Sequence, residues 1–176
     1  MPFDAAAQQK DLLGGHAGCS NARRMDFIAT IDYDLRTGLG RVIHATSEGE
    51  SAFQVAAAAV GGEDPRLLLL DRARRYGRAA SALRALAREQ GIAIRAERAT
   101  DRPVRLAGDA AARDDAAIVM ECEHIEDSAL VAYRDALELA LPGPVRAVVE
   151  REFDGLIASL GSLRALRERL AARTRV

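Results

Sequence analysis

Apolar residues recur along this chain at alternating spacings of three and four, the repeat that one buried face of a helix produces. The repeat covers the approximate ranges 35–60, 65–90, 114–140 and 145–172. Asp64 and Pro65 are expected to begin the second range as N-cap and first helical residue, and Gly91 is expected to end it. The pattern therefore predicts four long helices and no strands.

Two stretches of the chain lack this repeat. Residues 1–25 contain several glycines and small polar residues, so we expect a flexible N-terminal tail before a bundle domain over 26–176. Residues 92–113 carry Pro103, Gly108 and mixed charge. A connection of this length is unusual inside a compact domain, and it is long enough to run back along a helix bundle. We expect it to be a crossover loop.

The two helical hairpins resemble each other in sequence. The residues Leu-Arg-Ala-Leu at 83–86 recur eighty positions later at 163–166. Glu50 and Glu126 also lie at similar places in the first helix of each hairpin. Alanine and arginine are common here and chance explains part of this, but we favour duplication of one hairpin. The predicted fold class is all-α, a ferritin-like four-helix bundle made of two helical hairpins joined by a long crossover loop.

Composition narrows the classes of function. Hydrophobic residues make up 49% of the 176 residues and aromatics only 4%, and 25 basic residues nearly balance 26 acidic ones. We therefore expect no nucleic-acid partner, and we interpret the basic runs at 72–78 and 164–173 as solvated helix faces. The N-terminus resembles no secretory signal and no run is apolar enough to span a bilayer, so we expect a cytoplasmic protein.

Two glutamates fall near the centre of apolar helix faces. Glu50 and Glu126 should project inward, and a buried carboxylate must be protonated, paired, hydrogen-bonded or bound to metal. Inward glutamates from two helices are half of a di-iron site, whose other half is a Glu-x-x-His on each remaining helix. At that level the second and fourth helices offer Gly77, Ala80, Ile157 and Leu160. None of these four residues can bind a metal, so we expect no metal cofactor.

An ion pair is the preferred hypothesis for the two glutamates. Arg84 and Arg164 project toward the apolar side about one turn beyond them, and helical side chains lean toward the N-terminus. The predicted core polar cluster consists of Glu50, Glu126, Arg84, Arg164, Tyr76 and Tyr133. The alternative is that both arginines extend into solvent and the glutamates hold a water molecule.

These residues favour a protein without catalytic residues. We predict a non-enzymatic cytoplasmic helical-bundle protein with a scaffold or stress-related accessory role. Leu67, Leu68 and Leu86 lie beyond the main apolar face and predict a homodimer. Two alternatives remain open. One is a ferritin-like metalloprotein that binds iron or manganese through Glu50 and Glu126, with Glu123 and Tyr76 as additional ligands. The other is a module that binds a small apolar ligand inside the bundle.

The third and fourth helices resemble an uncharacterised bacterial family of ferritin-like four-helix bundles, the domain of unknown function 2383. The similar segments are 121–133, 145–151, 163–167 and, in the first helix, 49–53. The resemblance implies the same architecture over about 39–170, and it implies no activity because the family has none established. This chain has Leu160 where relatives often carry histidine and His44 where they often carry glutamate, which weakens a transferred metal site.

Overall fold

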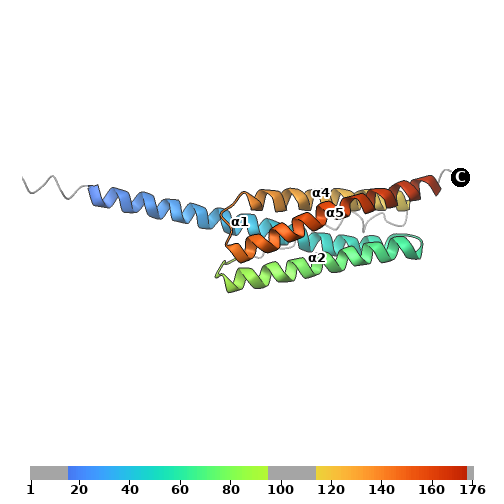
Figure 1. Ribbon diagram of the computed structural model, residues 1–176, viewed down its shortest axis with the longest axis horizontal. Helices are drawn as coiled ribbons and strands as arrows, with labels where there is room; N and C mark the ends of the chain where they lie inside the picture. The colour runs from blue at the N-terminus through green and yellow to red at the C-terminus, as the bar shows by residue number, and fades with distance from the viewer. Residues whose placement is uncertain (1–15, 95–113, 174–176) are drawn as a thin grey trace, which may run out of the picture. The chain divides into compact units, whose positions relative to one another are not determined.

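The computed structural model describes the backbone of residues 16–94 and 114–173, and their side chains from residue 32 onward. The helices are α1 (His16–Ala59), α2 (Glu63–Glu89), α4 (Asp115–Leu137) and α5 (Gly143–Arg173), and no strand occurs in these ranges (Figure 1). Residues 1–34 and 35–176 form two separate units, and the packing described below belongs to the second. Within the described residues, the all-helical class and the four helices are as the sequence predicted.

Helix α1 begins at His16, well before the expected start at about residue 35. The difference arises because the apolar repeat reports a face that packs on other helices, whereas a helix can continue without such a face. Residues 1–15 of the predicted tail lie outside the described residues, and so do residues 95–113 of the predicted crossover loop.

The ends of α2 correct one prediction and confirm another. The helix begins at Glu63 after Gly62, whose φ of 91° suits glycine, so Asp64 and Pro65 lie inside the first turn and Asp64 is not the N-cap. At the other end, Gly91 has a φ of 67°. The amide of Ile92 donates to the Ala87 carbonyl at 2.8 Å, and that of Gly91 donates to the Arg88 carbonyl at 3.1 Å. This is a Schellman motif, which ends the helix where the glycine predicted.

The second hairpin is also closed by specific side chains. The carboxylate of Asp114 accepts a hydrogen bond from the Ala117 amide at 2.7 Å and so caps the start of α4. Between α4 and α5, Arg146 donates to the Leu137 carbonyl at 2.7 Å. These contacts satisfy backbone groups that a helix end would otherwise leave unpaired.

Neighbouring helices of the bundle run in opposite directions, because early positions in one helix meet late positions in the other. Helix α1 contacts α2 through Ser47–Arg84 and Gly49–Tyr76, and it contacts α4 through Arg41–Asp135 and Gly61–Asp115. Helix α5 contacts α2 through Arg72–Ser159 and Arg75–Gly155. It contacts α4 through Glu123–Arg167 and Leu137–Arg146. Residues 35–59 of α1 therefore run parallel to α5, and α2 runs parallel to α4. The end of α2 and the start of α4 lie at opposite ends of the bundle (Figure 1).

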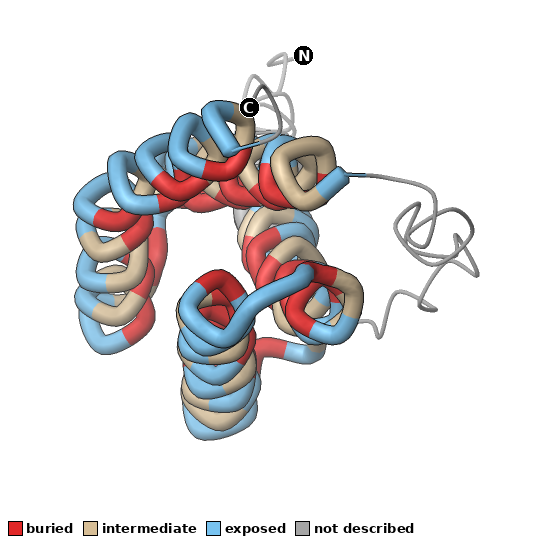
Figure 2. The backbone as a smooth tube through the Cα atoms, turned by 90° about the vertical axis from the view of Figure 1, so that its right-hand side faces the viewer, coloured by how far each residue is buried: buried red, intermediate tan, exposed pale blue. Residues whose placement is uncertain are grey.

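The buried faces of the four helices turn toward a common core (Figure 2). The predicted apolar face of α1 is buried, including Leu39, Thr46 and Phe53, which have no exposed surface. Small residues let helices approach closely, and Gly49 of α1 lies directly against the ring of Tyr76. Within the described ranges, no helix has the length and apolar character needed to cross a bilayer.

Candidate polar site in the bundle core

Glu126 is a carboxylate inside the apolar core. Its side chain on α4 has no exposed surface, and it shares one face of the helix with the buried residues Cys122, Ala129 and Tyr133. The nearest opposite charge is Arg72 on α2, whose Nη1 atom lies 3.6 Å from Oε1 of Glu126. Arg72 is itself only 8% exposed. The structure therefore places a buried acid beside a buried base.

Arg72 connects three helices through its guanidinium group. Its Nη2 atom donates to the Ser159 carbonyl at 2.8 Å and to the Ser162 hydroxyl, both on α5. The hydroxyl of Ser162 donates in turn to the Ser159 carbonyl at 2.8 Å. These contacts fix the guanidinium of α2 against α5 while its other nitrogen faces Glu126 on α4. The charge of Arg72 is thus directed into the core.

The surroundings of Glu126 disfavour its charged form. Burial raises the pKa of Glu126 to about 7, although the positive charges of Arg72 and Arg75 act in the opposite direction. Arg75 is half-buried, and it donates to the Gly155 carbonyl at 2.9 Å. The net result is a carboxyl group that exchanges its proton near neutral pH.

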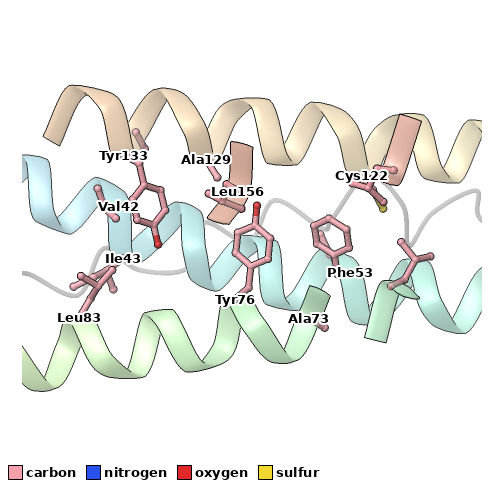
Figure 3. Packing of buried hydrophobic residues seen from close by; sticks show 14 of the residues in the cluster. Val42, Ile43, Phe53, Ala73, Tyr76, Leu83, Cys122, Ala129, Tyr133 and Leu156 are labelled. Carbon is pink, nitrogen blue, oxygen red and sulfur yellow. The ribbon is translucent and has the colours of Figure 1, made fainter. Parts of the chain in front are cut away.

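Two tyrosines point into the same interior from opposite helices (Figure 3). Tyr133 on α4 bonds the Thr46 hydroxyl at 3.2 Å, and Thr46 donates its own proton to the Val42 carbonyl, so Tyr133 is the donor. Burial raises the pKa of Tyr133 to about 12. Tyr76 on α2 stacks on Phe53 with 5.4 Å between ring centroids, but its buried hydroxyl has no hydrogen-bond partner among the described residues. The Tyr133 hydroxyl therefore has a hydrogen-bond partner, whereas the Tyr76 hydroxyl has none among the described residues.

Burial and the negative charge of Glu126 hold the pKa of Tyr76 far above its ordinary value. Burial likewise raises the pKa of the Cys122 thiol to about 12, again with a contribution from Glu126. Both groups stay protonated at neutral pH. Cys122 is therefore a buried, unreactive thiol rather than a nucleophile.

Glu50 lies in a different environment from Glu126. It is half-buried, and its carboxylate covers Gly77, so that a Cβ atom added to Gly77 would lie 2.5 Å from Oε1 of Glu50. Glu50 is not among the charges that shift the pKa of Glu126. The structure does not join the two glutamates in one site.

Arg84 and Arg164 are the two arginines predicted to pair with the core glutamates. Both side chains are exposed, and Arg84 donates to the hydroxyl of Ser47 on α1 instead of pairing with a carboxylate. Long arginine side chains reach solvent readily from a position near the edge of an apolar face. The base that the structure places beside Glu126 is Arg72, and the predicted approach of Arg84 and Arg164 to the glutamates stays a prediction.

Arg72 belongs to the basic run that the sequence predicts to be a solvated helix face, so sequence reasoning did not find its place in the core. That assignment suits Arg74 and Arg78, which are exposed. A signal was nevertheless present, since Arg72 lies three residues after Leu69 and four before Tyr76, both of which are buried. Residues at these spacings share one helix face. Ser159 and Ser162 gave no comparable signal, because serine is common at exposed helix positions.

The residues proposed as alternative metal ligands each contact another group in the structure. Glu123 accepts a hydrogen bond from Arg167 at 2.8 Å, Glu50 lies on Gly77, and Arg72 brings a positive charge to Glu126. Among the described residues, no group of three or more histidine, cysteine, aspartate or glutamate side chains could hold a metal ion. A cation at Glu126 would also meet the charge of Arg72.

Comparison with known proteins gives no further assignment. No family model matches the chain, and no curated protein is significantly similar to it. The resemblance to the ferritin-like family of unknown function stays a prediction from the residues that carry it.

Proposed function

We propose that this protein is a non-enzymatic helical bundle of the ferritin-like type that acts as a scaffold or accessory protein in the cytoplasm. The observation that carries the proposal is the buried pair of Arg72 and Glu126. In a di-iron bundle, inward glutamates neutralise metal ions, whereas here a guanidinium already supplies the positive charge. The interior is therefore used to hold helices together.

The directions of the helices support the ferritin-like part of this proposal. In that arrangement, two antiparallel hairpins are joined by one long connection, and the second and third helices run parallel. The parallel α2 and α4 and the placement of their ends agree with such a connection. A bundle with only short loops would instead make α2 and α4 antiparallel.

Metal analysis distinguishes this proposal from the metalloprotein alternative. Protein purified without chelators should contain no stoichiometric transition metal, and Glu126→Gln should leave the metal content unchanged. Asp127→Asn is a matched control, since Asp127 is the exposed acidic neighbour of Glu126. Stoichiometric iron or manganese that disappears in Glu126→Gln and persists in Asp127→Asn would overturn the proposal.

A scaffold must also have a protein ligand. Lys10 is the only lysine in the chain, so a crosslinker that joins carboxylates is more suitable than one that joins amines. Crosslinking of the full chain in its own cells should give reproducible crosslinks from exposed acidic residues to a defined protein or to a second copy. A chain that yields only internal crosslinks would contradict the scaffold role.

A further inference from the structure

Three polar atoms in the core have no hydrogen-bond partner within the described protein. They are both carboxylate oxygens of Glu126 and the hydroxyl oxygen of Tyr76. The two side chains are 0% and 2% exposed. Tyr76 follows Arg72, the neighbour of Glu126, by one turn of α2. Its hydroxyl points toward Ala129, which follows Glu126 by about one turn of α4 (Figure 3). Buried polar groups are nearly always hydrogen-bonded, so three such atoms together require an explanation.

The distance between Arg72 and Glu126 also indicates that a hydrogen-bond partner lies between or beside them. A direct charged N–H···O bond measures about 2.7–2.9 Å, whereas Nη1 of Arg72 lies 3.6 Å from Oε1 of Glu126. Arg72 cannot simply move closer, because its Nη2 atom is bonded to Ser159 and Ser162 on α5. A polar contact longer than about 3.5 Å is commonly bridged by a water molecule.

The surrounding groups determine what kind of molecule could lie among these three unpaired atoms. The oxygens of Glu126 accept hydrogen bonds, Nη1 of Arg72 donates, and the Tyr76 hydroxyl can do either. A cation would be repelled by Arg72, and an anion would be repelled by Glu126 whenever that group is ionised, so a neutral molecule that can both donate and accept fits the site. It must also be small, because Tyr76 extends into a core packed with Ala129 and Leu156 (Figure 3).

We propose that Glu126, Tyr76 and Arg72 form a binding site for an ordered water molecule that joins α2 and α4 inside the core. The water donates to the ionised carboxylate of Glu126 or accepts from its protonated form, accepts from Arg72 or Tyr76, and satisfies atoms that the protein leaves unpaired. Buried water of this kind makes about three hydrogen bonds and is part of the folded structure. The site is independent of the proposed scaffold role and would exist whatever partner the protein binds.

Replacement of Tyr76 by phenylalanine separates a hydrated site from a dry one. In a dry core, Tyr76→Phe removes an unpaired hydroxyl and raises the urea midpoint of unfolding. In a hydrated site, it removes one partner of the water and lowers the midpoint. Tyr133→Phe is the matched control, because it removes a hydroxyl that bonds directly to Thr46 and should lower the midpoint in either case. A midpoint that rises in Tyr76→Phe would overturn the proposal.

A crystal structure of the full chain gives a second test that does not depend on a variant. Electron density for one water within hydrogen-bonding distance of both Glu126 and Tyr76 would support the site. A direct hydrogen bond between these two side chains, or an anomalous signal from a metal ion between them, would each contradict it.

Discussion

Glu126 is the residue at which burial and charge conflict most directly. Its ordinary pKa of 4.5 rises to about 7 because the core solvates the carboxylate poorly. The protonated form therefore fits the folded state better than the ionised form. Arg72 reduces this cost without removing it, because its guanidinium lies 3.6 Å away.

The raised pKa predicts how stability depends on pH. The stabilisation from proton binding is fully present below pH 4.5, decreases as pH rises, and is lost above about pH 7. Over that interval Glu126 should lower the free energy of unfolding by about 3 kcal/mol. Glu126→Gln is neutral at every pH and should lack this component. Urea unfolding of both proteins at several pH values measures the difference.

The exposed neighbour of Glu126 is the control for this experiment. Asp127→Asn removes one acidic group from the same turn of α4 without touching the core, so it should retain the pH dependence of the original protein. Equal slopes of stability against pH in Glu126→Gln and the unmodified protein would show that Glu126 is not responsible.

At the scale of the helices, the approach of α1 to α2 depends on glycine. A Cβ atom added to Gly49 would lie 2.6 Å from the ring of Tyr76, and this ring is held by Phe53 and cannot move aside easily. Alanine favours a helix by about 1 kcal/mol over glycine, but overpacking a core costs about 1–3 kcal/mol. The cost of overpacking should exceed the gain in helix propensity, so Gly49→Ala should destabilise the protein.

Gly161 on α5 provides the opposite case. No atom lies within 4 Å of a Cβ atom added there, so Gly161→Ala should raise the free energy of unfolding by up to about 1 kcal/mol through helix propensity alone. Thermal or urea unfolding of the two variants gives the comparison. If Gly49→Ala proved as stable as Gly161→Ala, the close packing of α1 on α2 would be refuted.

The helices could be predicted from sequence because their signals are local. The apolar repeat located the packed part of each helix in the described ranges, and Gly91 marked the end of α2. The partner of the core carboxylate could not be assigned in the same way, since it depends on the rotation and axial offset of α2 against α4 and α5. An error of one turn in that offset already changes which side chain of α2 faces Glu126. Here the true partner, Arg72, lies about three turns before Arg84, the residue that was predicted.

At the scale of the whole molecule, the remaining question is what the outer faces of the bundle contact. Of the three leucines expected to form a second surface, Leu68 and Leu86 pack partly against the core, and Leu67 is 56% exposed. Ile157 on α5 is also half exposed. Exposed apolar side chains on a helix face are one mark of a protein contact, although single ones are common.

We predict that Leu67 contributes to a homodimer. Light scattering at high micromolar concentration should give a mass near twice 18.9 kDa, and Leu67→Lys should shift the mass toward the monomer because a lysine charge in an apolar contact is poorly solvated. Ile157→Lys is the matched control on another helix and should leave the dimer intact. If Ile157→Lys alone dissociated the dimer, the dimer contact would lie on α5 and not on α2. A monomeric mass for the unmodified chain would refute self-association.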